Sequence, residues 1–126
     1  MDMADNFWSA SEVLEKARKA EDGRDEKHNI NYTFLHRGEH CTLNAVQMAD
    51  SINGIPLHVH KDHDEIIQLL EGEGEVVIGD EKKILKKGDV FFVPKGTPHA
   101  LRFGCIILSI YAPAFDTNNP DRIFLE

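Results

Sequence analysis

Three histidines and one glutamate stand at spacings that could hold a divalent metal ion. His58 and His60 are two residues apart in an alternating segment, so on a β-strand both side chains would point to the same face. A short polar loop follows, and Glu65 opens the next segment, where an antiparallel neighbour about 4.8 Å away would bring its carboxylate to the same point. Imidazole nitrogens bind metals at about 2.1 Å and carboxylates add a hard anionic ligand, so the pattern predicts a metal site.

His99 lies much further along the chain, just after the turn Pro94-Lys95-Gly96. Only a closed barrel would bring it to the same place as the other three residues. Three imidazoles and one carboxylate suit Fe, Mn, Ni, Co, Cu or Zn, so the sequence predicts one divalent transition metal without deciding its identity. Four protein ligands leave two positions free on an octahedral metal, and an open position is the mark of a catalytic site.

The elements that must position these residues are short β-strands. A single helix is predicted over about 9–20, because Ser9 and Glu12 form a capping box. After about Asn29, β-forming segments alternate with turns about every eight to twelve residues, which is typical of an all-β sandwich or barrel. We expect an arm over 1–28 and a single β-barrel domain over 29–126. The expected strands cover residues 30–36, 41–48, 57–60, 65–70, 75–79, 90–94, 99–103, 105–112 and 122–125, with a further short one within 82–89.

Two segments carry a resemblance to a known family. They read His58-x-His60-x4-Glu65-x6-Gly72 and Gly88-x5-Pro94-x-Gly96-x2-His99. These segments resemble the two motifs of the cupin family, and the resemblance extends over roughly residues 40–115. It implies a double-stranded β-helix, or jelly-roll barrel, with one short N-terminal helix ahead of it. It also implies that His58, His60, Glu65 and His99 are the metal ligands.

Strand position also indicates which side chains line the cavity around this site. Phe103 stands where the family's second motif often has Asn, and it shares a strand face with His99, so we expect an apolar wall. The hairpin residues Asp62, His63 and Asp64 are expected to be solvated. The pocket-lining candidates are Gln47, Ile67, Phe92, Leu101, Phe103 and Tyr111.

Composition and charge restrict the partners and the location. The 126 residues carry a net charge of −8, from 22 acidic and 14 basic residues, which argues against nucleic acid and against an anionic membrane surface. No stretch reaches the 18 or so apolar residues of a membrane span, and the first residues do not read as a secretory signal. We therefore expect a cytoplasmic protein in which Cys41 and Cys105 are free and behave as small apolar side chains.

Two hypotheses about function follow. The first is a metal-dependent small cupin enzyme that acts on a small organic molecule, with a dioxygenase as the leading reaction and an isomerase or decarboxylase as alternatives. The second is a non-catalytic cupin that binds or senses a metal or small ligand. The resemblance further implies a homodimer, in which the N-terminal segment of about 9–36 pairs with the partner's sheet and covers its edge. No catalytic residue beyond the metal ligands can be named from the sequence.

Overall fold

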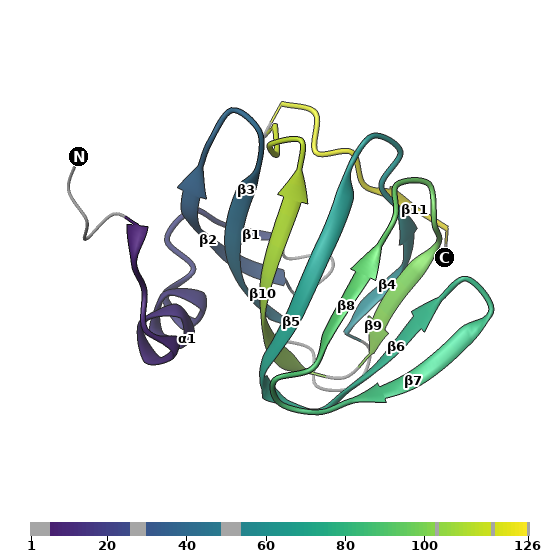
Figure 1. The fold of residues 1–126 in the computed structure, drawn as a ribbon, viewed down its shortest axis with the longest axis horizontal. Helices are drawn as coiled ribbons and strands as arrows, with labels where there is room; N and C mark the ends of the chain where they lie inside the picture. Colours follow the sequence, from purple (N-terminus) through teal and green to yellow (C-terminus); the bar gives the residue numbers. More distant parts are fainter. Residues whose placement is uncertain (1–5, 26–29, 49–53, 103, 117, 126) are drawn as a thin grey trace.

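Two antiparallel β-sheets packed face to face form most of the protein (Figure 1). The structure, a computed structural model, describes residues 6–25, 30–48, 54–102, 104–116 and 118–125. One sheet has six strands in the order β1-β2-β3-β10-β5-β8, and the other has five in the order β11-β4-β9-β6-β7. The six-stranded sheet contains β1 (Gly23–Asp25), β2 (Ile30–Arg37), β3 (Thr42–Met48), β10 (Cys105–Ala112), β5 (Asp64–Gly72) and β8 (Val90–Val93). The five-stranded sheet contains β11 (Ile123–Phe124), β4 (Ile55–Val59), β9 (His99–Arg102), β6 (Gly74–Ile78) and β7 (Glu81–Leu85).

The all-β architecture with one short N-terminal helix, predicted from the sequence, is confirmed. Each expected strand has a counterpart within a few residues of its predicted bounds. Strand β1 was not expected, because the sequence analysis assigned its residues to the arm. It pairs with β2 through three residue pairs. Its sequence, Gly23-Arg24-Asp25, has no β-forming residue, so pairing with the neighbouring strand, rather than local propensity, accounts for it.

Helix α1 (Ala10–Lys19) covers the outer face of the six-stranded sheet. Ser9 Oγ accepts a hydrogen bond from Glu12 N at 3.2 Å, so the predicted capping box is present. The buried face of the helix consists of Val13 and Ala17, which pack against Ala45 of β3 and Ile106 of β10. This packing makes the helix part of the same layered structure as the sheets.

The main core lies between the two sheets. In β3 the side chains of Asn44, Val46 and Met48 face this interior, whereas Ala45 faces the helix. The same alternation in β10 turns Ile107 and Ser109 inward. Period-two alternation therefore gives the six-stranded sheet two apolar faces, one toward the helix and one toward the second sheet.

Three further features concern the cysteines, the edge of the five-stranded sheet and the helix. Cys41 is half-buried, Cys105 is buried, and both thiols are free. Lys82 and Lys83 are exposed on β7, which is the edge strand of its sheet and is protected there by charge. Within the ranges that the structure describes, no helix has the length and apolar character needed to cross a membrane.

Candidate metal centre

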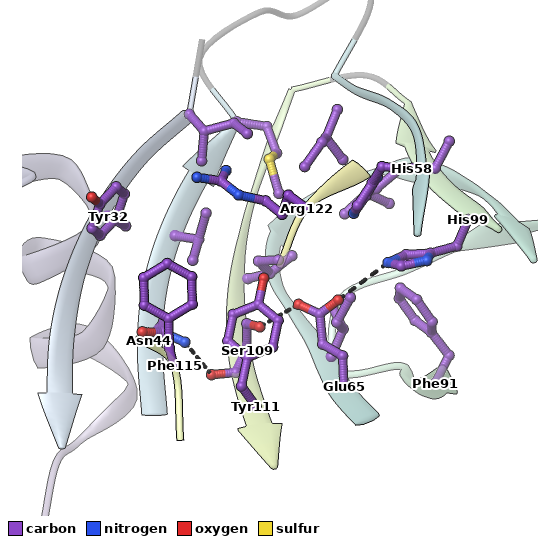
Figure 2. Close-up of a pocket in the computed structure, with 18 of the residues that line it drawn as sticks. Tyr32, Asn44, His58, Glu65, Phe91, His99, Ser109, Tyr111, Phe115 and Arg122 are labelled. Atoms are coloured by element: carbon purple, nitrogen blue, oxygen red, sulfur yellow. Dashed lines mark hydrogen bonds and ion pairs between the residues drawn. The ribbon is translucent and has the colours of Figure 1, made fainter. Parts of the chain in front are cut away.

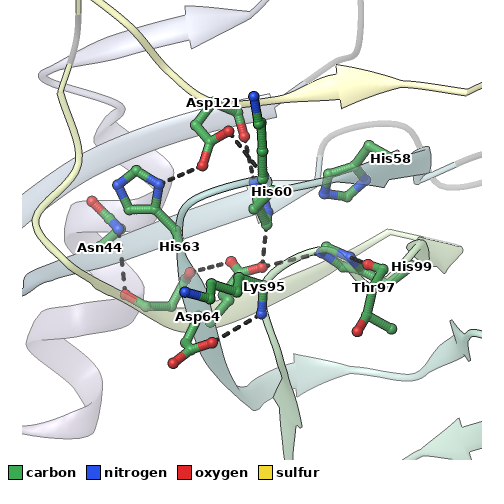
Figure 3. A network of polar contacts seen from close by, with 12 residues as sticks. Asn44, His58, His60, His63, Asp64, Lys95, Thr97, His99 and Asp121 are labelled. Carbon is green, nitrogen blue, oxygen red and sulfur yellow. Dashed lines mark hydrogen bonds and ion pairs between the residues drawn. The ribbon is translucent and has the colours of Figure 1, made fainter.

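His58, His60 and His99 meet between the sheets at one end of the barrel (Figure 3). His58 lies on β4, His60 directly follows that strand, and His99 begins the neighbouring strand β9, where it is paired with His58. One ring nitrogen from each residue lies within 4.8 Å of the other two. Each of the three side chains is only about 2% exposed. The distant third histidine thus arrives beside the other two through strand pairing.

The three imidazoles are held in the same way by backbone carbonyls. Nδ1 lies 2.7 Å from Pro56 O in His58, 2.9 Å from Asp121 O in His60, and 2.9 Å from Thr97 O in His99. A carbonyl oxygen can only accept, so each Nδ1 is the protonated donor, and Nε2 carries the lone pair when the ring is neutral. This outer hydrogen bond is what metal-binding histidines commonly show, because it sets the ring's tautomer and orientation.

Glu65 borders the three rings from strand β5. Its Oε1 lies 3.2 Å from His60 Nε2 and 3.3 Å from His99 Nε2. Its other oxygen, Oε2, accepts a hydrogen bond of 2.5 Å from Ser109 Oγ on the adjacent strand β10. The carboxylate is 4% exposed, so it is a buried anion whose two oxygens face different partners.

The electrostatics of the cluster favour a neutral His58 ring and a charged Glu65 carboxylate. Burial, together with His99 and His60, lowers the pKa of His58 to about 3. Burial opposes the charged form of Glu65, but its contacts with His60 and His99 outweigh burial and hold its pKa well below the usual range. Burial likewise disfavours a charged His60, yet the same carboxylate raises the pKa of that ring. The cluster therefore keeps one permanent negative charge beside nitrogen lone pairs.

Two backbone contacts bring the second motif against the first. Gly96 N donates a hydrogen bond of 2.7 Å to His60 O, and Lys95 N donates one of 2.9 Å to Asp64 Oδ1. Gly96 has a φ of +80°, a conformation that a glycine adopts without steric cost. The predicted turn at 94–96 thus joins the segments that carry His60, Glu65 and His99.

The chemistry of these groups fits a divalent cation. His60 Nε2 is buried and, although it lies 3.2 Å from Glu65 Oε1, has no hydrogen-bond partner among the described residues. A buried lone pair facing a carboxylate is unfavourable unless a proton or a cation lies between them. Nitrogen and carboxylate donors are the ligands that transition metals prefer. The cluster could therefore bind a metal, whose identity the residues do not determine.

A cavity extends from the cluster into the interior of the barrel (Figure 2). His58, Glu65 and His99 form its polar end, and Arg122 is the one cationic side chain among the described lining residues. Aromatic side chains make up much of the rest, namely Tyr32, Phe34, Phe91, Tyr111 and Phe115. The aliphatic wall includes Ile30, Val46, Met48, Ile55, Ile67, Leu101 and Ile107. The cavity wall is thus mainly apolar, with Glu65 and Arg122 as its charged side chains among the described lining residues.

Three predicted lining residues, Ile67, Leu101 and Tyr111, line this cavity. Burial, followed by the charge of Glu65, raises the pKa of the Tyr111 hydroxyl well above its usual value. Phe103 lies outside the described residues.

Two predicted lining residues do not line the cavity. Phe92 is 53% exposed, because it is paired with Ile66 on the outer face of the sheet, and its neighbour Phe91 points inward. Gln47 faces away for the same reason, since Val46 and Met48 on either side of it occupy the inner face. The segment 90–93 is apolar on both faces, so composition alone could not distinguish the inner phenylalanine from the outer one.

The expectation that His63 is solvated is wrong. Its side chain is 8% exposed, and Nδ1 donates a hydrogen bond of 2.6 Å to Asp121 Oδ2. Asp121 and Arg122 are site residues that the sequence analysis did not identify, because nothing local marks a tail segment as part of a distant site. Ser109 was also missed, although a lone serine within the otherwise apolar strand 105–112 is a visible signal.

Comparison with known proteins agrees with the fold and the motifs. Residues 47–104 match the family model described as "Cupin domain". The structure of KdgF from Halomonas sp. superposes with a TM-score of 0.65 at 23% identity, over 75% of this chain and 90% of that one. The match to the cupin model and the similarity in fold both support the cupin-superfamily domain that the motifs predicted.

Two curated relatives share part of the sequence. Quercetin 2,3-dioxygenase of Bacillus subtilis is 44% identical over 50 residues, which is 40% of this chain and 15% of that protein. Pectin degradation protein KdgF of Dickeya dadantii is 37% identical over 72 residues, which is 55% of this chain and 64% of that protein. The chain thus spans less than two thirds of the length of either curated relative.

Proposed function

We propose that this protein is a metal-dependent cupin enzyme that acts on a small organic molecule, and that its reaction is a dioxygenation. The observation that carries the proposal is the orientation of the three imidazoles, each bound through Nδ1 to a backbone carbonyl so that Nε2 is left for a metal. Two of the three residues, His58 and His99, also line the cavity. The 44% identity with a quercetin dioxygenase over 50 residues supports the choice of reaction.

His58, His60 and His99, with Glu65 beside them, are the residues that would hold the metal. A bound divalent metal supplies Lewis acidity and, for redox-active ions, the capacity to activate O2. Ser109 keeps the Glu65 carboxylate oriented and charged through its short hydrogen bond. The aliphatic and aromatic wall excludes water, which strengthens electrostatic interactions within the site.

Tyr111 is the best-placed proton donor in the cavity. Its ring packs edge-on against His60, with centroids 5.1 Å apart, and its hydroxyl interacts with the Glu65 carboxylate, so the side chain belongs to the metal-binding end. Because its pKa is raised, the hydroxyl stays protonated over the physiological range and can donate a hydrogen bond to a substrate oxygen. We assign Tyr111 the role of orienting an oxygen atom of the substrate.

Arg122 indicates the charge of the substrate. Its guanidinium lies along the cavity wall and reaches away from His58 toward the side of Tyr32 (Figure 2). Among the described lining residues, Arg122 is the one cation and Glu65 the one carboxylate. A guanidinium in an apolar surrounding recognises carboxylates. We therefore propose a small organic anion whose other end approaches the metal centre.

Isomerase and decarboxylase chemistry are the alternatives within the same site. The relative named for pectin degradation supports testing acidic sugars as substrates, since pectin is a polymer of such sugars. Oxygen consumption separates these reactions from a dioxygenation. Neither alternative consumes O2, whereas a dioxygenase consumes one O2 for each substrate and places both atoms in the product.

The experiment is an oxygen-electrode screen of the metal-loaded protein against aromatic and sugar carboxylates, repeated under 18O2. Substrate-dependent uptake with two labelled atoms in the product would establish the dioxygenase. Turnover without uptake would favour an isomerase or a decarboxylase. Saturable binding with no turnover of any compound would contradict the enzyme and favour a ligand-binding cupin.

We also propose a homodimer in the cytoplasm. Helix α1 packs on its own sheet, and beyond it the outer face of β5 and β8 carries exposed Ile66, Val90 and Phe92. Ile66 is paired with Phe92 on one side and with Ile110 on the other, which forms a continuous apolar row. A second copy of the same row would cover this surface about a two-fold axis. The free thiols of Cys41 and Cys105 suit a reducing compartment.

A further inference from the structure

The C-terminal segment runs beside β4, which carries His58 and directly precedes His60. Strand β11 pairs with β4, with Phe124 opposite His58. Leu125 N donates a further hydrogen bond of 2.9 Å to Leu57 O. This pairing brings Asp121, just before β11, against the connection between β4 and β5 (Figure 3).

The Asp121 carboxylate binds that connection through three donors. Oδ1 accepts a hydrogen bond of 2.9 Å from Lys61 N, and Oδ2 accepts one of 2.7 Å from Asp62 N. Oδ2 also accepts the 2.6 Å hydrogen bond from His63 Nδ1, and both side chains of this pair are less than 10% exposed. The carboxylate thus accepts hydrogen bonds from two backbone N–H groups and one ring N–H of the loop that immediately follows His60.

The backbone of Asp121 acts on His60 itself. Its carbonyl oxygen accepts the hydrogen bond from His60 Nδ1 at 2.9 Å. Asp121 has a φ of +53°, in the left-handed region that aspartate tolerates better than most residues. His58 and His99 differ in this respect, because each bonds to a carbonyl only two residues before it in the chain. Only His60 depends on a residue 61 positions away.

We propose that Asp121 is a positioning residue, which sets the orientation and tautomer of His60 from the C-terminal segment while its carboxylate holds the loop at 61–63. The carbonyl and the carboxylate of one residue act together, so losing the side chain releases the loop and, with it, the alignment of the carbonyl. The proposal rests on the proposed metal site for its consequence, but its structural part concerns His60 alone.

Asp121→Ala is the test, with Asp116→Ala as the matched control. Asp116 is exposed in the same segment, and its side chain accepts a hydrogen bond only from Asn118 N among the contacts described. Long-range 1H–15N spectra of the metal-free protein at pH 8 report the tautomer of each ring. A Co2+ titration followed by visible absorption reports the metal affinity.

We expect His60 to change from the Nδ1–H form to a mixture of tautomers in Asp121→Ala, with the His58 ring unchanged. Co2+ affinity should fall about 10- to 100-fold, as is usual when an outer hydrogen-bond partner is removed. Asp116→Ala should behave as the wild type in both measurements. An unchanged His60 ring in a folded Asp121→Ala variant would overturn the proposal, as would an equal effect in the control.

A second variant covers the case in which Asp121→Ala does not fold. Asp121→Asn keeps one oxygen acceptor and tolerates the left-handed backbone, so we expect the same change in His60, but smaller, with Co2+ affinity reduced less than 10-fold. A His60 ring identical to the wild type in this folded variant would also count against the proposal. If the wild type takes up no Co2+, the metal function fails, and the ring spectra still decide the role of Asp121.

Discussion

Ser109 and Glu65 are joined by a buried hydrogen bond of 2.5 Å between Ser109 Oγ and Glu65 Oε2. The two residues lie on adjacent strands, and Ser109 is paired with Ile67, two positions beyond Glu65. The hydroxyl supplies a donor to the carboxylate oxygen that does not face His60 and His99. Without it, one oxygen of a buried anion would lack a partner, which is costly in a site of low dielectric.

Removing this hydroxyl should destabilise the protein. We expect Ser109→Ala to lower the free energy of unfolding by about 1–3 kcal/mol, because a buried carboxylate oxygen loses its partner. Urea denaturation monitored by circular dichroism measures the change. Ser11→Ala is the control, since Ser11 is exposed on helix α1 and alanine favours helices, so it should alter stability by less than about 0.5 kcal/mol.

Metal binding should require the three buried histidines and should not require an exposed histidine elsewhere in the chain. His58→Ala and His99→Ala should each abolish the expected stoichiometry of about one metal ion per chain, because two imidazoles and one carboxylate hold a transition metal far less well than three imidazoles and one carboxylate. Elemental analysis of untagged protein gives the answer. His40→Ala is the matched control, since the His40 side chain is 90% exposed, and it should retain the metal. Equal metal content in all variants would contradict the site.

Arg122 should affect substrate affinity more than metal content. We expect Arg122→Met to raise KM for an anionic substrate about 10-fold or more, through loss of a charge-assisted hydrogen bond. The KM of Arg122→Lys should lie between those of the wild type and Arg122→Met, because lysine keeps the charge but not the planar guanidinium. Arg24→Met, at an exposed arginine on β1, is the control. An unchanged KM in Arg122→Met would show that the substrate is not bound through its negative charge.

Stability should fall at alkaline pH because of Cys105. Burial raises the pKa of this thiol from 9.0 to about 12. Above pH 9 the thiol of the unfolded chain therefore loses its proton, whereas the folded chain keeps it. This ionisation stabilises the unfolded state, so the free energy of unfolding decreases as pH rises. From pH 9 to pH 10 we expect a loss of about 1 kcal/mol from this group. Urea titrations between pH 9 and pH 10 should show this slope, and Cys105→Ala should remove most of it, because the raised pKa of Tyr111 contributes mainly above pH 10. A slope that persists in the variant would assign it to another group.

The dimer should depend on the exposed apolar row of the six-stranded sheet. Phe92→Glu places a charge in the middle of the proposed contact, so we expect the sedimentation mass to fall from two chains to one. Ile84→Glu is the control, because Ile84 is equally exposed, at 52% against 53% for Phe92, but lies on β7 of the other sheet. A wild-type mass of one chain would contradict the proposed dimer. A Phe92→Glu variant that remains dimeric would show that a different surface forms the dimer contact.

The strands and the cluster of histidines could be predicted from the sequence, because they depend on short-range regularities. Period-two alternation places His58 and His60 on one face, and the resemblance of two fixed-spacing segments to the cupin motifs implied Glu65 and His99. Helix α1 follows from its capping box in the same local way. The capping box involves residues close in the chain, and the alternation of side chains between the two faces is the same in every strand.

The tertiary structure alone decided which residues complete the site. Phe91 and Phe92 are chemically identical neighbours, and only the register of β8 on β5 turns the first inward and the second outward. His63 reads as part of a polar loop until Asp121, 58 positions later, reaches it. Arg122 enters the cavity for the same reason, because its segment is drawn against β4 by strand pairing. Contacts between distant segments form only when the whole chain folds, so local patterns carry no record of them.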